Sequence, residues 1–429
     1  MKERIAVLQG MRTPLGKMGG AFKNFTPETL GSIILRELVA QNPEYNELIE
    51  EVIAGNVAQP AEAMNIARVI SLRAGLKQSI PAFTVHRNCA SGFEAITSAI
   101  VRILSGHNNM IAAVSSESMT NIPFLFNNDF KSYLENLMRA RTTPKKIKAI
   151  LKFRLKMLKP EIGLKLGLTD PTNGMIMGDT ADLLAREFNI SRLEQDEYAL
   201  NSHLKASDAI KNNQFADEIY PIIYDSVKTK FLEHDEGVRE KQNMADLQKL
   251  KPYFDRKNGT ATAGNSSQIT DGAAAVFLAS ESYAKKHKLK PLGFIKDFVY
   301  CGCDPKRMGL GPVYSTQQLL KRNKANIKDF DLIEINEAFA SQVLACVRAF
   351  DSTKFAKENL GLSKKIGSID LSKLNINGGA IAVGHPVGVT GMRLIIHLLH
   401  QMKIKNKSTS LASLCVGGGQ GGSVFLEAE

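Results

Sequence analysis

Long hydrophobic runs are missing from this 429-residue sequence. Its apolar stretches are short and interrupted by charged residues, so none is long enough to cross a bilayer as a helix. The opening stretch, MKERIAVLQG, has neither the apolar core of a signal peptide nor the Arg- and Ser-rich character of a transit peptide. The final residues, FLEAE, match no common targeting signal. These absences favour a cytoplasmic protein.

Cysteine is scarce, and the five cysteines are scattered along the chain: Cys89, Cys301, Cys303, Cys346 and Cys415. An odd number at irregular spacing argues against a disulfide framework and fits a reducing compartment. No cysteine or histidine spacing resembles a zinc site, so we expect no metal. With 44% hydrophobic and 23% charged residues the composition is that of a globular protein, long enough for two or three packed units.

Acidic residues are almost missing from one segment. Between Lys131 and Lys159 there are ten Lys and Arg residues and one acid, Glu135, so the segment carries a net charge of 10 − 1 = +9 of the +12 of the whole chain. Because the charge is local and no RNA- or DNA-binding motif accompanies it, we expect no nucleic-acid partner. The basic segment instead indicates a local docking device.

Short strand-like segments alternate with helical patterns at both ends of the chain. Apolar side chains recur at helical spacing over residues 93–104 and 392–399. The expected strands span residues 3–10, 50–57, 81–88, 109–116, 331–337 and 408–415. This alternation, with largely buried strands, predicts an α/β fold.

A weak internal repeat is visible. Cys89 opens a small-residue turn, a helix and a strand that lead to Met119, 30 residues later, and the stretch from His385 to Cys415 has the same length and order. Each copy follows a strand that ends in an asparagine. Two copies of one unit would place both turns at equivalent strand ends, where α/β sites are built.

The repeat divides the chain into three expected units. Residues 1–120 together with 251–285 would form an N-terminal half, and residues 286–429 a C-terminal half. Residues 121–250 are more helical, more charged and poorer in strands. We interpret them as an insertion into the first half.

Cys89 and His385 are candidates for chemistry. Cys89 lies after a strand and just before a helix, and a helix N-terminus favours a thiolate. His385 is held on a turn between Gly384 and Pro386, where a histidine with a pKa near neutrality suits a general base. Taken singly, a buried structural cysteine is the better interpretation of Cys89, and a loop histidine explains His385 about equally well.

Four other residues stand in similar places. Asn336 ends a strand, and Glu337 is expected to open a helix, so Asn336 is either a helix cap or a donor to an oxyanion. Cys415 ends a strand and is followed by five glycines in seven residues. Met177 and Ser267 lie in turns that are uninformative by themselves. Together, two cysteines, a histidine and an asparagine at strand ends of a duplicated unit provide a nucleophile, a base and a second acid or base.

In these motifs the sequence resembles the thiolase family from end to end. The motifs occur in family order as RTPLGK, NCASG, MGDTAD, TAGNSSQITDGAA, GLGP, INEAFA, NGGAIAVGHPVGVTG and CVGGGQGG. Within the family, SRLEQDEYALNSH and the basic KFRLKMLKPE resemble the long-chain degradative branch, which includes the β-subunit of the fatty-acid oxidation trifunctional complex. Asn336 departs from that branch, much of which has a histidine there.

The resemblance implies roles for individual residues. Cys89 would be the nucleophile that takes the acyl group, His385 would activate it, and Cys415 would move the proton at the α-carbon of acetyl-CoA. Asn336 with His385 would form one oxyanion hole, and the backbone N–H groups of Cys89 and Gly417 the other. Ser267 and Met177 would line the channel for CoA and the acyl chain.

The resemblance also implies a fold, an activity and partners. The fold would be five-layered αβαβα from two duplicated halves with an inserted helical loop domain. The activity would be thiolysis of 3-ketoacyl-CoA in fatty-acid β-oxidation, with CoA as co-substrate and no other cofactor. A homodimer or larger oligomer is implied, as is an enoyl-CoA hydratase/3-hydroxyacyl-CoA dehydrogenase subunit as partner. The alternatives are a short-chain acetyl-CoA acetyltransferase and an inactive scaffold with this fold.

Residues 139–165 form an expected basic amphipathic helix. Ile147, Ile150, Leu151, Arg154 and Leu158 would lie near one face, with lysines over much of the remainder. Such a helix is typical of a membrane-surface or partner-docking element, and of a solvated helix that covers a channel. The resemblance favours peripheral membrane contact or complex assembly.

Overall fold

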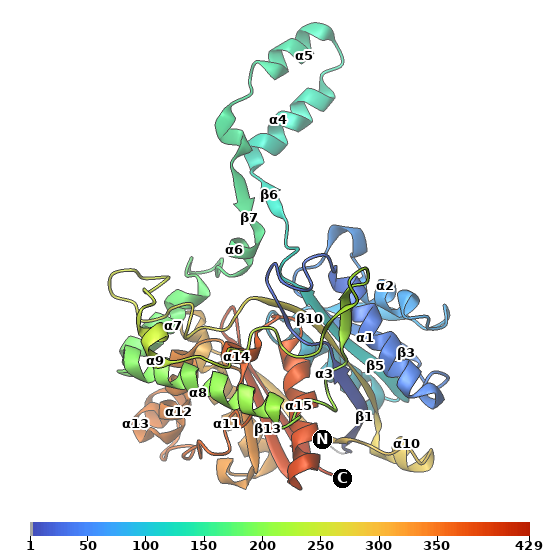
Figure 1. Cartoon of the computed structure of the whole chain (residues 1–429), viewed down its shortest axis with the longest axis vertical. Coiled ribbons are helices and arrows are strands. Elements are labelled where there is room, and N and C mark those ends of the chain that lie inside the picture. Colours follow the sequence, from blue (N-terminus) through green and yellow to red (C-terminus); the bar gives the residue numbers. More distant parts are fainter. Residues whose placement is uncertain (1–2) are drawn as a thin grey trace.

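A mixed β-sheet runs through the body of the computed structural model, which describes residues 3–429 (Figure 1). Its first half contains, in spatial order, β1 (Ile5–Arg12), β10 (Thr270–Ser280), β5 (Met110–Ser118), β3 (Glu51–Gly55) and β4 (Ala82–Val85). Its second half contains β11 (Gly293–Gly302), β14 (Gln420–Glu427), β13 (Thr409–Val416) and β12 (Leu332–Ile335). β1 and β11 join the halves, and the short β2 (Gly16–Lys17) pairs with β10.

The two halves repeat one topology, as the sequence repeat predicts. In the first half β1, β10 and β5 are antiparallel neighbours, and β3 and β4 continue in parallel from β5. In the second half β11, β14 and β13 are antiparallel neighbours, and β12 continues in parallel from β13. A parallel bridge from Ile333 to Leu374 takes the place of a fifth strand.

Helices separate and cover the two halves of the sheet. α3 (Ser91–Leu104) and α15 (Thr390–Lys405) lie in the central core, α1 (Pro27–Gln41) and α2 (Ile66–Arg73) cover the first half, and α11 (Gly311–Asn323) and α12 (Ala340–Asp351) cover the second. Because successive side chains of a strand point to opposite faces, Ile111 of β5 enters the central core while Met110 and Ala112 enter the outer core. The layers are therefore αβαβα, which confirms the predicted fold class.

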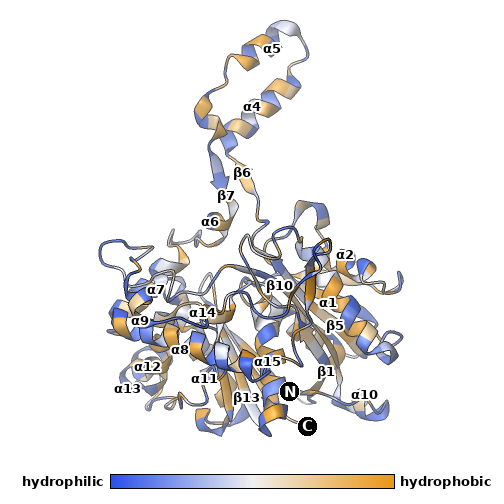
Figure 2. Cartoon of the chain, viewed as in Figure 1, coloured by the Kyte–Doolittle hydropathy of each residue, from blue (hydrophilic) through white to orange (hydrophobic). Residues whose placement is uncertain are grey.

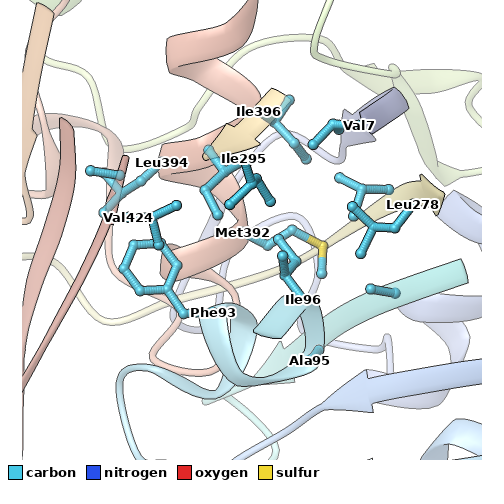
Figure 3. Close-up of a cluster of buried hydrophobic side chains, with 14 of the residues drawn as sticks. Val7, Phe93, Ala95, Ile96, Leu278, Ile295, Met392, Leu394, Ile396 and Val424 are labelled. Carbon is cyan, nitrogen blue, oxygen red and sulfur yellow. The ribbon is translucent and has the colours of Figure 1, made fainter. Parts of the chain in front are cut away.

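The central core brings the helices that follow the two repeated turns into contact. Phe93 and Ile96 of α3 pack with Met392 and Ile396 of α15 (Figure 3). The remaining short helices of this body are α10 (Glu281–Lys286), α13 (Thr353–Leu360) and α14 (Ala380–Val383). The starts of α3 and α15 are thereby fixed next to each other.

Residues 121–250 form two different structures. The second part contains α6 (Gly163–Gly167), α7 (Met177–Glu187), α8 (Arg192–Lys211), β8 (Ile222–Asp225), β9 (Lys230–Leu232) and α9 (Met244–Gln248). α7 and α8 pack against α12, and α8 also packs against α14. α7 and α8 thus lie on the second half in space, whereas Ile222 of β8 packs in the outer core of the first half.

The first part, residues 121–163, projects from the body, and we call it the arm (Figure 1). It contains β6 (Phe124–Phe126), α4 (Asn128–Arg139), α5 (Thr143–Ile150) and β7 (Pro160–Ile162), and β6 pairs with β7 at its base. Hydrophobic and hydrophilic residues are interspersed along α4 and α5 (Figure 2). Large apolar side chains are exposed, among them Met138 (84%), Leu155 (79%) and Phe124 (70%).

The single amphipathic helix expected over residues 139–165 is wrong. α5 ends at Ile150, and a turn leads into a short 3-10 helix at Leu155–Leu158. The chain turns because Phe153 packs on Tyr133 of α4, with ring centroids 5.5 Å apart, in an aromatic cluster with Phe130. Within residues 3–429, no helix is both long and apolar enough to span a bilayer.

Candidate active site

Four predicted site residues lie where strands or their connections end. Cys89 lies between β4 and α3, and His385 lies between α14 and α15. Cys415 is the last residue but one of β13, and Asn336 directly follows β12. Since α3 and α15 start side by side in the central core, and β12 pairs with β13, these residues belong to one region.

The turn before α3 holds Cys89 in a constrained conformation. Asn88 has a φ of +44°, a left-handed value that asparagine tolerates better than most residues. Ser91 Oγ accepts from the Arg87 N–H at 2.9 Å and donates to the Asn88 carbonyl at 2.8 Å. Burial raises the pKa of the Cys89 thiol, while hydrogen bonds from the backbone N–H groups of Gly417 and of Cys89 itself lower it. The resting group is therefore a thiol that needs a base, with two N–H donors beside its sulfur.

His385 is buried and neutral. Burial lowers its pKa to about 3, and the charge of Arg393 adds to the decrease. The hydroxyl of Thr390 lies 2.6 Å from His385 Nδ1 and donates to the Pro386 carbonyl at 3.2 Å, so we assign it as the acceptor of an Nδ1–H. This tautomer leaves a lone pair on Nε2, as a general base requires. α15 begins only at Thr390, so Pro386 precedes the helix instead of opening it.

Cys415 faces the same site from the second half. It is 2% exposed, and burial raises the pKa of its thiol well above the ordinary value, with the nearby Cys89 adding to the rise. Met177 and Phe254 pack around it with Ala338 and Phe339. Cys415 is thus a protonated thiol at neutral pH in a largely apolar wall.

Asn336 does not cap a helix, because α12 begins four residues later at Ala340. Its backbone N–H donates to the Ser413 carbonyl at 2.9 Å, which ties it to the strand of Cys415. Both polar atoms of its buried side chain have no hydrogen-bond partner among the described residues. Buried amides are nearly always satisfied, so a water or substrate oxygen is the expected partner. The capping interpretation is wrong, and the oxyanion interpretation fits.

Met177 and Ser267 lie beside the catalytic candidates. Met177 opens α7, and its sulfur would lie 3.5 Å from a Cβ added at Gly417. Ser267 precedes β10, and its N–H donates to the Ala338 carbonyl at 3.0 Å. Ala338 is part of the wall around Cys415, so both residues border the same space.

A cavity of about 560 Å³ lies along residues 239–250, and sequence reasoning missed it. It is lined by Arg239, Glu240, Lys241, Gln242, Asp246 and Leu250. Gln268 connects its loop to the site, because its side-chain amide donates to the Gly237 carbonyl at 3.0 Å and its backbone carbonyl accepts from the His385 N–H at 3.0 Å. No sequence signal marks these lining residues, which all belong to the charged stretch of residues 239–250.

Comparison with known proteins identifies the family to which this chain belongs. The family model for the N-terminal domain of thiolases matches residues 5–282, and that for the C-terminal domain matches residues 289–428. The chain belongs to the thiolase family. A 3-ketoacyl-CoA thiolase from Shewanella piezotolerans is 37% identical, with 100% of this chain and 97% of the relative covered. The resemblance seen in the eight sequence motifs is therefore confirmed, and with it the class of acyltransferases.

Solved thiolase structures have the same architecture. Human mitochondrial 3-ketoacyl-CoA thiolase in complex with CoA is 36% identical, with a TM-score of 0.86 and coverage of 100% of this chain and 98% of the other. A Bacillus anthracis acetyl-CoA acetyltransferase is 34% identical, with a TM-score of 0.87 and coverage of 100% and 99%. The thiolase fold is thus shared by enzymes named for two different reactions.

Proposed function

We propose that this thiolase cleaves 3-ketoacyl-CoA with CoA, giving acetyl-CoA and an acyl-CoA shortened by two carbons, in fatty-acid β-oxidation. The observation that carries the proposal is the placement of Cys89, Cys415 and the neutral His385 in one region with two backbone N–H groups beside the Cys89 sulfur. Full-length relatives named 3-ketoacyl-CoA thiolase support the substrate class.

In the first step His385 Nε2 takes the thiol proton of Cys89, and the sulfur attacks the 3-keto carbon. The N–H groups of Cys89 and Gly417 stabilise the developing oxyanion, which is worth roughly 3 kcal/mol per donor in comparable sites. The bond between carbons 2 and 3 then breaks. The acyl group stays on Cys89, and the acetyl-CoA enolate takes a proton from Cys415.

The enolate oxygen also needs stabilisation. Asn336 and His385 would provide it, because the buried amide of Asn336 has unused hydrogen-bonding groups. In the second step the Cys415 thiolate takes the proton of the CoA thiol, the CoA sulfur attacks the acyl group on Cys89, and the released Cys89 thiolate takes its proton back from His385. CoA is a co-substrate here, and the proposed steps use no other cofactor.

The cavity lined by Arg239 and Lys241 is a suitable site for the nucleotide end of CoA. Its lining has two cations, Arg239 and Lys241, that suit the phosphates, and two acids, Glu240 and Asp246, of which Asp246 pairs with Lys249 at 2.9 Å. Leu250 extends the lining toward Gly264 in the loop that leads to Ser267. The pantetheine arm would then pass Ser267 and Met177 toward Cys89. The CoA complex of the human relative supports CoA binding.

A short-chain acetyl-CoA acetyltransferase is the second candidate, because the Bacillus anthracis structure is equally similar. Thiolysis rates for 3-ketoacyl-CoA substrates from four to sixteen carbons decide between the two. We expect activity that persists or rises with chain length, and its loss in Cys89→Ala. Activity on acetoacetyl-CoA alone would favour the second candidate, and inactivity on every chain length would favour a scaffold.

The arm adds a docking function to this proposal. Its net charge of +9 between Lys131 and Lys159 and its exposed apolar side chains suit an anionic membrane surface. The contact first predicted for residues 139–165 therefore extends over both strands and helices of the arm. Sedimentation with vesicles rich in anionic lipid at low salt tests it, with neutral vesicles as the control.

Two assembly predictions complete the proposal. We expect a homodimer or larger oligomer, and a hydratase/dehydrogenase subunit as partner in β-oxidation. Light scattering after gel filtration measures the first, and a monomeric mass would contradict it. Co-purification with the hydratase/dehydrogenase of the same cell tests the second, with an arm-deleted chain showing whether the arm is the docking element.

A further inference from the structure

Glu117 is a buried carboxylate that plays no part in the chemistry described so far. It lies at the carboxyl end of β5 and is 0% exposed. Among residues 3–429 no Lys, Arg or His side chain lies within ion-pair distance of it (the ion pairs found all join other residues). A buried charge is costly unless hydrogen bonds satisfy it, so its partners explain why the fold retains it.

The carboxylate accepts three backbone N–H groups from two loops. Oε2 accepts from Val57 and from Gly388, each at 3.0 Å, and Oε1 accepts from Ala58 at 2.9 Å. The side-chain amide of Asn56 donates to Oε1 as well, at 3.2 Å. Glu117 therefore ties the loop after β3 to the turn that carries His385.

The same turn is pressed against the start of α3. A Cβ added at Gly92 would lie 2.8 Å from the Met392 nitrogen and 3.0 Å from the Gly388 oxygen. A Cβ added at Gly388 would lie 2.5 Å from Glu117 Oε2. Gly388 is thus enclosed between Glu117 on one side and the helix that follows Cys89 on the other.

From this arrangement we propose that Glu117 is a positioning residue of the thiolase reaction. Its carboxylate holds the peptide of Gly388, which lies three positions after His385 in the chain. By fixing this turn, Glu117 keeps His385 at the distance from Cys89 that proton transfer requires. The inference rests on the proposed function for its meaning in catalysis. Its geometric content, the placement of His385 against Cys89, does not depend on the substrate.

The test replaces one acceptor oxygen. In Glu117→Gln the new NH₂ group faces N–H donors, so one pair of hydrogen bonds is lost. We expect kcat for thiolysis to fall by about 10- to 100-fold, because small displacements of catalytic groups have effects of this size. KM for both substrates should stay within about twofold, since Glu117 touches neither.

Alkylation of Cys89 by iodoacetamide without substrate gives an independent readout. The rate should fall together with kcat in Glu117→Gln, because His385 no longer meets the thiol in the right place. Glu51→Gln is the matched control: Glu51 is a buried carboxylate at the opposite end of β3, paired with Arg102. It should leave both rates unchanged.

The outcomes separate the two proposals. If wild-type protein has no thiolase activity, the proposed function fails, and the alkylation rates still decide on Glu117. The positioning role would be overturned if folded Glu117→Gln were alkylated at the wild-type rate, or if Glu51→Gln lost as much of its alkylation rate as Glu117→Gln. If Glu117→Gln does not fold, Glu117→Asp replaces it: both oxygens remain but reach one methylene less, and the same loss of alkylation rate is expected.

Discussion

The side-chain amide of Asn88 donates a hydrogen bond to the carbonyl oxygen of Gly417 across 2.7 Å. This bond joins the residue before the nucleophile to the glycine whose N–H lies beside the nucleophile's sulfur. The loop around Gly417 is the turn between β13 and β14, with positive φ values at Gly418 (+88°) and Gly419 (+80°), and the Cys303 N–H also ties it down by donating to the Gly419 carbonyl at 2.7 Å. Asn88 thus links one half of the duplicated fold to the other at the oxyanion site.

Replacing Asn88 tests this link. Asn88→Gly keeps the left-handed conformation but loses the amide, so kcat should fall by about tenfold, the value of one hydrogen bond, with little loss of stability. Asn88→Ala should lose the same activity and in addition about 1–2 kcal/mol of stability, because alanine is strained at positive φ. Steady-state kinetics and thermal unfolding measure both effects, and full activity in Asn88→Gly would refute the link.

A buried charge cluster makes the stability dependent on acid pH. Glu218 accepts from Arg12 Nε at 2.8 Å and lies 2.7 Å from His397 Nδ1. Burial alone would raise the pKa of Glu218, but His397 and Arg12 outweigh it and lower the pKa to about 2. A carboxylate whose pKa is lowered in the folded protein stabilises the fold at pH values above its pKa in the unfolded chain. This stabilisation is lost as the pH falls toward 2.

Glu218→Gln should therefore cost about 3 kcal/mol of unfolding free energy at neutral pH, as breaking a buried pair does. The difference from wild type should shrink as the pH is lowered from about 5 to about 3. Urea unfolding at the two ends of this range measures it. A difference that is constant with pH would mean that Glu218 carries no ionic stabilisation.

The pKa of Glu117 is shifted in the opposite direction to that of Glu218, so we expect a pH dependence of opposite sign near neutrality. Burial raises its pKa to about 7, with Asp271 adding to the rise against the backbone N–H groups that lower it. The ionised form holds the Gly388 turn, so activity should fall as the pH drops through about 7. Because the pKa of Glu117 is raised in the folded protein, the protonated carboxyl is favoured there over the ionised one. Its contribution to stability is therefore present below the unfolded pKa of about 4.5 and is lost as the pH rises through about 7.

The pH–rate profile of kcat checks this prediction. His385 does not account for an acid limb near pH 7, because its pKa is about 3. The titratable groups around Glu117 are Asp271 on β10 and the Cys89 thiol, whose own pKa is raised. The acid limb should be missing in Glu117→Gln, and a limb that persists there would assign it to another group.

The arm is predicted to be dispensable for catalysis. Phe124 of β6 pairs with Ile162 of β7, so a two-residue Asn-Gly turn placed between them closes the chain without the rest of the arm. Because α4 packs on α5 and not on the body, thermal stability and thiolysis of short substrates should be unchanged. Binding to anionic vesicles should be lost. Retained vesicle binding would place the contact elsewhere on the molecule.

Sequence reasoning identified six strands of the sheet, the repeat and the catalytic candidates because these features are local, and it missed β11 and β14. Cys89 and Cys415 stand near strand ends and His385 on a turn after Gly384, and apolar periodicity marks neighbouring elements. The arm was misjudged for a physical reason: a basic helical pattern over residues 139–165 does not show that Phe153 turns back to pack on Tyr133. Asn336 was left undecided, since the start of α12 at Ala340 was not visible in the pattern.

Glu117 and the cavity around Arg239 were missed for a different reason. Glu117 stands in a strand as an ordinary polar residue, and its partners are 60 and 271 positions away in sequence. The cavity is formed by a charged loop that reads as solvated surface. The contacts of Glu117 join distant segments, which composition and spacing do not encode, whereas the cavity is lined by residues 239–250 alone.

The central claim is a covalent acyl group on Cys89. Mass spectrometry of the protein after incubation with a 3-ketoacyl-CoA, in the absence of free CoA, tests it most directly. The account predicts one acyl group, shortened by two carbons, on the peptide that contains Cys89, its removal on adding CoA, and no adduct in Cys89→Ala. An acyl group on Cys415 instead, or turnover without any adduct on Cys89, would contradict it.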